Sequence, residues 1–275
     1  MDIDRARARK AFAEYVRPYG TDNPRIALKV VHTNRVADSC DDIARSLGMD
    51  EDDVDLAWLC GLLHDIGRFE QLRIWDTFSD GDSASHAHIG VEALFGKGAS
   101  GDAAAAIDSA RRCDIRRFLD DRAQDGLIRE TVARHSDFRL PEGIDGRTRT
   151  FCEIVRDADK VDILRTLQEN TVETILKVPA SAFLGARFSP EALAAFRSHR
   201  CLRRDERHSP ADYLLGLVAF VYELEYPESR KILRDRGYLQ TFLERPFGIE
   251  PVFDDPETQR IYGEISREAS AAVKA

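Results

Sequence analysis

The chain has 275 residues, of which 43% are hydrophobic and 32% are charged. This composition is ordinary for a soluble globular protein, and the length suits one domain with an extension or two joined domains. The net charge of −9 disfavours non-specific binding to a nucleic acid polymer or to an anionic membrane, because both require a basic protein surface. A small basic pocket for an anionic metabolite remains compatible with this charge.

The N-terminus and the cysteines favour a cytoplasmic protein. The first ten residues, MDIDRARARK, are too charged for the apolar core of a signal peptide. The longest apolar stretch, Tyr213 to Tyr222, is too short to span a bilayer as a helix. Five scattered cysteines without a CxxC pair are typical of reduced thiols, not of a disulfide framework or a zinc knuckle. No feature of the sequence indicates an oligomeric state.

The first predicted helix covers residues 23–48. Asn23 suits the N-cap, Pro24 suits the first helical position, and Gly48 is a typical C-terminal stop. Small or apolar residues recur at intervals of three and four, which indicates one face of an amphipathic helix: Ile26, Val30, Thr33, Ala37, Cys40, Ala44 and Leu47.

Helical signals continue along the rest of the chain. A mostly apolar helix is expected over residues 52–65, with Gly67 ending it and Arg68 at its exposed edge. A third helix is predicted to start near Ser83 or Ser85 and to stop by Gly96. Further helices are predicted over residues 102–119, 126–135 and 147–168, and prolines beyond Val178 divide the remainder into shorter helical pieces. There is no sustained alternation of period two. We therefore predict an all-α fold, with a helical bundle in residues 1–180 and a helical extension or cap in residues 181–275.

The stretch GLLHDIGRFEQ, residues 61–71, places a histidine and an aspartate directly after an apolar run. Burying ionisable groups costs several kcal/mol unless a partner replaces their water, so His64 and Asp65 require either a polar rim or a cation. His32 has Leu28 and Val36 one turn to either side, and we expect it to face the interior as well.

Three more side chains of metal-ligand type are expected to point inward. His135 shares a helix face with Val132, and Asp159 lies on an apolar stripe. His86 is followed four residues later by Gly90, which leaves room for another backbone or a ligand. A bundle interior that receives one such side chain from each of several helices is a setting in which metal sites are built.

These ordered motifs resemble those of the HD superfamily of metal-dependent phosphohydrolases, over roughly residues 20–170. HTNRVA looks like the first motif of the family, HDIGRF like the central one and DADKVDIL like the last. The resemblance implies an HD domain with a core of five or six helices. It also implies a metal site formed by His32, His64, Asp65 and Asp159.

SHAHIG and VARHSDF match two further histidine positions that a subset of the family uses for a second metal, here His86 and His135. On this basis Asp65 bridges the two ions. Imidazole and carboxylate ligands suit divalent Fe, Mn, Zn or Ni, and metal binding can lower the pKa of a water from about 15.7 to roughly 7.

Two ligand positions have competitors nearby. Asp157 competes with Asp159 as the last ligand, and the Ala-Asp-Lys context of the family favours Asp159. His88 competes with His86, and the HxxxG spacing to Gly90 favours His86.

Basic residues next to these motifs are candidates for catalysis together with Asp65. The resemblance implies that Arg35, Arg68 and Lys160 contact a substrate phosphate, and the alternative is that they are solvated helix charges. His199 and His208 lie among arginines, and we interpret that segment as solvated and locally basic.

The sequence thus predicts a cytoplasmic, helical, dinuclear phosphohydrolase that acts on a small phosphate ester or anhydride, a nucleotide being one candidate. Two other classes stay open. Some HD proteins with two irons are oxygenases with the same ligands, which anaerobic phosphate release and oxygen consumption would distinguish. A ligand-sensing module without turnover is disfavoured, because all five motifs are intact.

Overall fold

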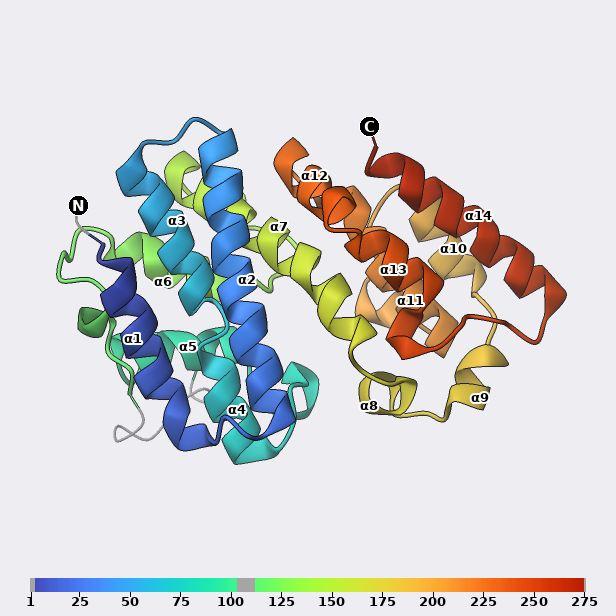
Figure 1. Ribbon diagram of the computed structural model, residues 1–275, viewed down its shortest axis with the longest axis horizontal. Helices are drawn as coiled ribbons and strands as arrows, with labels where there is room; N and C mark the ends of the chain where they lie inside the picture. The colour runs from blue at the N-terminus through green and yellow to red at the C-terminus, as the bar shows by residue number, and fades with distance from the viewer. Residues whose placement is uncertain (1–2, 103–111, 275) are drawn as a thin grey trace. The chain divides into compact units, whose positions relative to one another are not determined.

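The computed structural model describes residues 3–102 and 112–274, and every regular element in these ranges is an α-helix or a 3-10 helix (Figure 1). The predicted all-α fold is confirmed. The chain forms two compact units, Met1–Asp159 and Lys160–Ala275, which are described separately below. The division falls within one long helix, whereas the predicted domain boundary at residue 180 stays a prediction.

The elements of the first unit, in chain order, are α1 (Arg5–Val16), η1 (Arg17–Tyr19), α2 (Pro24–Ser46), α3 (Glu51–Leu63), α4 (Gly67–Trp75), η2 (Asp80–Asp82), α5 (His86–Phe95), η5 (Ile115–Arg117), α6 (Asp125–Arg134) and most of α7 (Gly146–Gln168). Helices α2 and α3 pack against each other, and α5 packs against both α4 and α6. The buried side chains of these helices form the core around which the site is built.

Capping at the two central helices follows the sequence. The Asn23 side chain accepts a hydrogen bond from the Arg25 amide at 3.0 Å, and Pro24 is the first residue of α2. The Asp50 carboxylate accepts from the Asp53 amide at 2.9 Å at the start of α3. Helix α3 is buried from residue 56 to its end, as expected for a central helix.

Glycines allow the closest helix contacts in the first unit. A Cβ atom on Gly61 would lie 2.8 Å from the Ala37 Cα, so α3 crosses α2 at this point. A Cβ on Gly67 would lie 2.1 Å from the His86 carbonyl oxygen and 2.5 Å from the Gly90 nitrogen. The backbones of α4 and α5 therefore meet directly. Of the two alternatives expected at Gly90, another backbone or a ligand, the structure shows a backbone, and this contact places His86 next to the end of α3.

The helix predicted over residues 102–119 is wrong where the structure describes it. Residues 103–111 lie outside the described ranges, and residues 112–119 contain only the 3-10 turn η5. Asp114 has a φ of 52°, and its carboxylate accepts from the Arg116 amide at 2.9 Å. The Cys113 amide donates to the Ala93 carbonyl at 2.9 Å, so this segment is fixed to the end of α5 and does not continue as a helix.

The predicted end of a helix at Gly67 is also wrong. Helix α3 already ends at Leu63, and Gly67 is the first residue of α4. Arg68 is consequently not at an exposed edge, since its side chain is only 16% exposed. Helix α1 was not predicted either; Ala8, Phe12 and other small or apolar residues bury its inner face.

Short helices make up the second unit: α8 (Val172–Leu176), α9 (Ala180–Leu184), α10 (Pro190–Arg197), η6 (Arg204–Glu206), α11 (Pro210–Val218), η7 (Ala219–Glu223), α12 (Pro227–Asp235), α13 (Tyr238–Glu244), η8 (Pro246–Gly248) and α14 (Pro256–Ala272). The predicted division by prolines is confirmed, because Pro190, Pro210, Pro227 and Pro256 each begin an α-helix. All five cysteines of the protein are free and buried. Among the described residues, no helix combines the length and the apolar character that crossing a membrane requires.

Candidate metal centre

Histidine and aspartate side chains from five helices or their ends converge inside the first unit. They are the six predicted metal ligands: His32 on α2, His64 and Asp65 directly after α3, His86 at the start of α5, His135 at the end of α6 and Asp159 on α7. All are buried except Asp159, whose side chain is 17% exposed. Two sets of ligand atoms lie within 4.8 Å of one another and could each hold a metal ion: His32, His64 and Asp159, and His64, Asp65 and His135.

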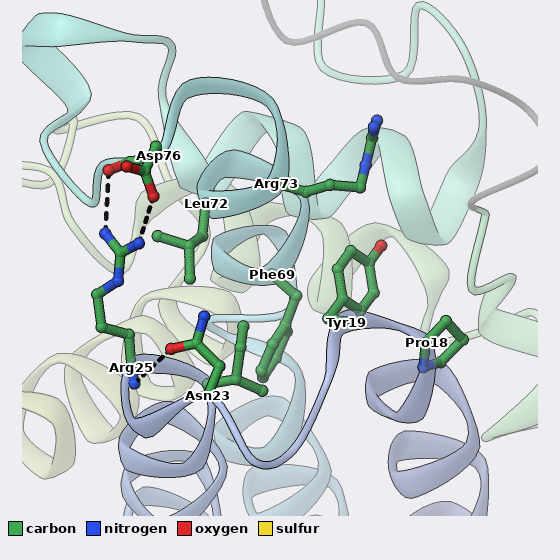
Figure 2. Close-up of a pocket in the computed structure, with 9 residues that line it drawn as sticks. Pro18, Tyr19, Asn23, Arg25, Phe69, Leu72, Arg73 and Asp76 are labelled. Atoms are coloured by element: carbon green, nitrogen blue, oxygen red, sulfur yellow. Dashed lines mark hydrogen bonds and ion pairs between the residues drawn. The ribbon is translucent and has the colours of Figure 1, made fainter.

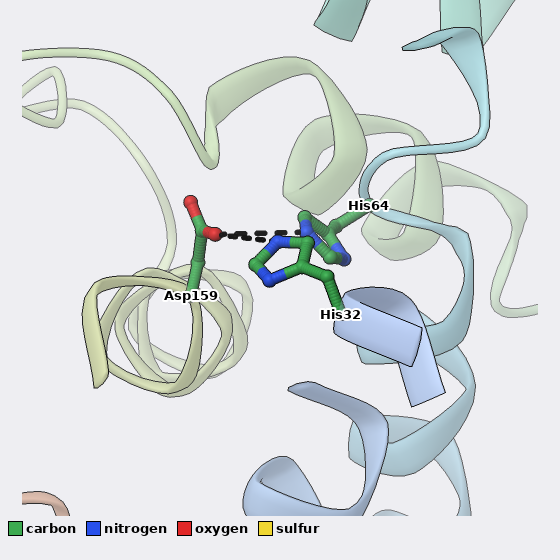
Figure 3. A group of neighbouring side chains, drawn as sticks. All are labelled: His32, His64 and Asp159. Carbon is green, nitrogen blue, oxygen red and sulfur yellow. Dashed lines mark ion pairs between the residues drawn. The ribbon is translucent and has the colours of Figure 1, made fainter. Parts of the chain in front are cut away.

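The first part of the cluster joins α2, α3 and α7. The Asp159 Oδ1 atom lies 3.1 Å from the His32 Nε2 and 3.8 Å from the His64 Nε2. Figure 3 shows the Asp159 carboxylate approaching the two imidazole rings from its own helix. The Asp65 Oδ2 atom lies 3.6 Å from each of the same two nitrogens. Two imidazoles and two carboxylates thus face a common point.

The second part of the cluster joins α5 and α6. The Nε2 atoms of His86 and His135 are 2.9 Å apart. The Oδ1 atom of Asp65 lies 3.3 Å from the first of these nitrogens and 3.7 Å from the second. The two oxygens of Asp65 therefore face two different pairs of histidines.

Hydrogen bonds on the far side of the rings fix which nitrogen faces the cluster. His64 Nδ1 donates to the Gly61 carbonyl at 2.6 Å, and His135 Nδ1 donates to the Val132 carbonyl at 2.8 Å. Both histidines follow the last residue of a helix, where carbonyls lack a partner within the helix. A neutral imidazole that carries its proton on Nδ1 presents a lone pair at Nε2, which is the form that binds a metal.

Asp80 orients the ring of His86 in a similar way. Its two carboxylate oxygens lie 2.8 and 2.7 Å from the His86 Nδ1. The same carboxylate accepts from Gln71 Nε2 at 2.8 Å and from Arg68 Nη1 at 3.2 Å. A carboxylate behind a histidine ligand fixes the ring and increases its basicity. Sequence analysis did not identify Asp80, because it precedes the motif and no spacing distinguishes it from Asp82.

Two basic side chains contact the carboxylate of Asp65. Lys29 Nζ donates to Oδ2 at 2.6 Å, and Arg68 Nε lies 3.3 Å from Oδ1. Arg68 was a predicted site residue, whereas Lys29 was missed. Lys29 lies three residues before His32, and residues at this spacing are neighbours on a helix face, so the position was a usable signal.

Burial and charge set the protonation states of the cluster. Burial lowers the pKa of His64 to about 4, and burial together with the nearby Arg68 charge lowers that of His86 to about 3. Burial alone would raise the pKa of Asp65, but Lys29, His64 and Arg68 hold it well below its usual value. The pKa of Asp159 is likewise lowered, because its hydrogen bond with His32 and nearby charges outweigh the effect of burial. At neutral pH His64 and His86 are therefore neutral, and Asp65 and Asp159 are ionised, which are the forms that metal binding requires.

The residues present fit divalent cations. The His64 Nε2 atom is buried and has no hydrogen-bond partner within the described ranges. With Nδ1–H fixed on both rings, His86 and His135 direct two lone pairs at each other across 2.9 Å, an arrangement that a cation between them stabilises. Imidazole nitrogen with carboxylate oxygen is the ligand set of Zn, Fe, Mn and Ni sites.

The competing residues lie elsewhere. His88 has a side chain that is 34% exposed, and its Nδ1 is 3.3 Å from Asp102. Asp157 is buried on α7, but the carboxylate grouped with His32 and His64 is that of Asp159.

The remaining basic and histidine positions are more exposed. Arg35 is on the exposed side of α2, and Lys160 is half-buried on α7, so their contacts with a substrate stay predictions. His199 is 64% exposed, stacks on Tyr222 and lies 3.1 Å from Glu268, all within the second unit.

A pocket of about 280 Å³ in the first unit is separate from this cluster (Figure 2). Phe69 and Leu72 of α4 are among its apolar lining residues. Arg25 at its rim is held by the Asp76 carboxylate, and Arg73 by that of Glu70.

The helical bundle and its buried histidine–aspartate cluster are compatible with a metal-binding domain. Residues 30–164 match the family model of the HD domain, a range that contains all six cluster residues. This part of the chain is an HD domain. No curated protein and no solved structure matches the chain.

Proposed function

We propose that the protein is a cytoplasmic phosphohydrolase that uses two divalent ions to hydrolyse a small phosphate ester or anhydride. The observation that carries this proposal is the division of the Asp65 carboxylate between two pairs of histidines. A carboxylate in this position can touch two ions at once. A carboxylate that binds a single ion would need only one of its two oxygens.

The ligands divide between the two ions. His32, His64, Asp65 and Asp159 would hold one ion, and Asp65, His86 and His135 would hold the other. When bound, the two ions would lower the pKa of a water to roughly 7 and polarise a phosphoryl oxygen. The hydrogen bonds of Gly61, Val132 and Asp80 keep the histidine rings in the orientation that ligation needs.

Lys29 and Arg68 bind the anionic substrate in this proposal. Both contact Asp65, and their side chains are 17% and 16% exposed, so they reach the cluster and keep some access to solvent. A phosphate next to the cluster meets two fixed cations, and charge-assisted hydrogen bonds of this kind are about twice as strong as neutral ones. Arg35 and Lys160 stay proposed as further phosphate contacts.

The test is phosphate release from a panel of nucleotides, sugar phosphates and anhydrides, with Mn, Fe(II), Zn or Ni added to metal-depleted protein. We expect at least one combination to release phosphate under anaerobic conditions, and Asp65→Ala to abolish that release. Asp82→Ala is the matched control, because Asp82 is an exposed carboxylate in the loop before His86. Oxygen consumption with reduced iron, without anaerobic phosphate release, would instead identify an oxygenase.

A further inference from the structure

The two cations that contact Asp65 both lie over the aromatic ring of Phe78. The ring centroid lies 5.7 Å from Lys29 Nζ and 5.9 Å from Arg68 Cζ. Phe78 is only half-buried. A flat apolar surface therefore stands next to the position where an anionic group is proposed to bind.

The loop that carries Phe78 is fixed to the cluster. The Phe78 carbonyl accepts from Arg68 Nη1 at 2.6 Å, and the same nitrogen lies 3.2 Å from the Asp80 carboxylate. Gln71 Nε2 donates to the Ala84 carbonyl at 3.1 Å and so holds the other end of the loop. A ring that is already held in place loses little conformational entropy when a ligand packs on it.

We propose that Phe78 is a stacking platform, and that the substrate is a phosphorylated compound with a planar aromatic group. This inference rests on the proposed phosphohydrolase function. The phosphate would lie at Lys29 and Arg68, and the aromatic group on the Phe78 ring. Nucleoside phosphates and aryl phosphates share this chemistry. Stacking of a base on an aromatic side chain strengthens binding by about 5- to 150-fold.

The experiment compares ligands that differ only in the aromatic group. The probes are phosphonates of adenosine and of ribose, in which a carbon replaces the ester oxygen and prevents hydrolysis. Phenylphosphonate and methylphosphonate form a second pair. Calorimetric titration of metal-loaded protein gives the ratio of the two Kd values in each pair.

We expect wild-type protein to bind at least one aromatic member about 5- to 150-fold more tightly than its partner. Phe78→Leu should bring that ratio close to one. The control is Phe95→Leu, because Phe95 is a half-buried phenylalanine at the far end of α5, and it should keep the wild-type ratio. Discrimination in the adenosine pair alone identifies a nucleoside phosphate, and discrimination in the phenyl pair an aryl phosphate.

Equal affinities within both pairs for the wild type, or a ratio that survives Phe78→Leu, would overturn the proposal. If Phe78→Leu does not fold, Phe78→Trp decides, since the adenosine or phenyl ligand should quench its added fluorescence and the matched partner should not. Absence of this quenching would also overturn it. Because these measurements need no turnover, they remain decisive even if no substrate releases phosphate, an outcome that would reject only the phosphohydrolase assignment.

Discussion

The Nε2 atoms of His86 and His135 lie 2.9 Å apart, and the opposite nitrogen of each ring is held by a carboxylate or a carbonyl. Two imidazole nitrogens bound to one ion at right angles, with bonds of about 2.1 Å, are separated by about 3.0 Å. The spacing is thus that of adjacent ligands of a single ion. Because Asp65 also faces this pair, the spacing supports the second metal position proposed above.

Metal stoichiometry tests this second position. We expect elemental analysis of protein equilibrated with Mn or Fe(II) to approach two ions per chain, and His86→Ala to reduce the value toward one. His88→Ala should leave it unchanged, because His88 is partly exposed and faces Asp102. A loss of metal from His88→Ala, with His86→Ala retaining both ions, would reverse the assignment.

Asp80 positions His86 and is not itself proposed as a ligand. Asp80→Ala removes the carboxylate behind the His86 ring, and loss of such a partner typically weakens metal affinity by about 10- to 100-fold. The weakening should affect one of the two binding steps in a calorimetric titration, which a general loss of structure would not do. Asp82→Ala, in the same loop, should bind both ions as the wild type does. Equal affinities in the two variants would contradict the role of Asp80.

The contact between α4 and α5 depends on Gly67. Gly67→Ala places a methyl group 2.1 Å from the His86 carbonyl oxygen, so the backbones must separate. We expect urea unfolding to show that the free energy of unfolding falls by about 1–3 kcal/mol. Gly126→Ala is the matched control, because a Cβ there has no neighbour within 4 Å among the described residues. The free energy of unfolding of that variant should rise by up to about 1 kcal/mol. A similar loss of stability in both variants would contradict the importance of the contact between α4 and α5.

A substitution of Lys29 tests substrate binding more selectively than one of Arg68. Arg68 also donates to the Phe78 carbonyl, so removing Arg68 would disturb the loop that carries Phe78. Losing a charge-assisted hydrogen bond costs about 1.5–3 kcal/mol, so Lys29→Met should lower kcat/KM by roughly 10- to 150-fold. Metal content should stay at the wild-type value. Lys10→Met, an exposed lysine on α1, should keep wild-type kcat/KM. Lys29→Met with wild-type kcat/KM would show that this ammonium only balances the Asp65 charge.

The sequence was informative where a ligand lies on a regular apolar face. His32 and Asp159 occupy such positions, and the contexts of His86 and His135 match known motifs, so the sequence predicts all six residues of the cluster. Asp80 was missed because its role depends on a loop conformation. Lys29 was missed although its spacing to His32 places both residues on one helix face, since its contact with Asp65 joins α2 to the segment directly after α3.

The errors in the predicted fold have physical causes in particular contacts. Gly67 was interpreted as a helix stop, but the close approach of the His86 backbone is what requires glycine there. Residues 112–119 lack the predicted helix because Asp114 adopts a positive φ and the preceding amide is bound to the end of α5. Tertiary contacts of this kind are not encoded in hydrophobic spacing.

Anomalous X-ray scattering from crystals of metal-replete protein, recorded at the absorption edge of the added metal, tests the central claim most directly. The account predicts two peaks, one in contact with His32, His64, Asp65 and Asp159, and one in contact with Asp65, His86 and His135. Well-ordered side chains at these positions that point apart, with no peak between them, would contradict it.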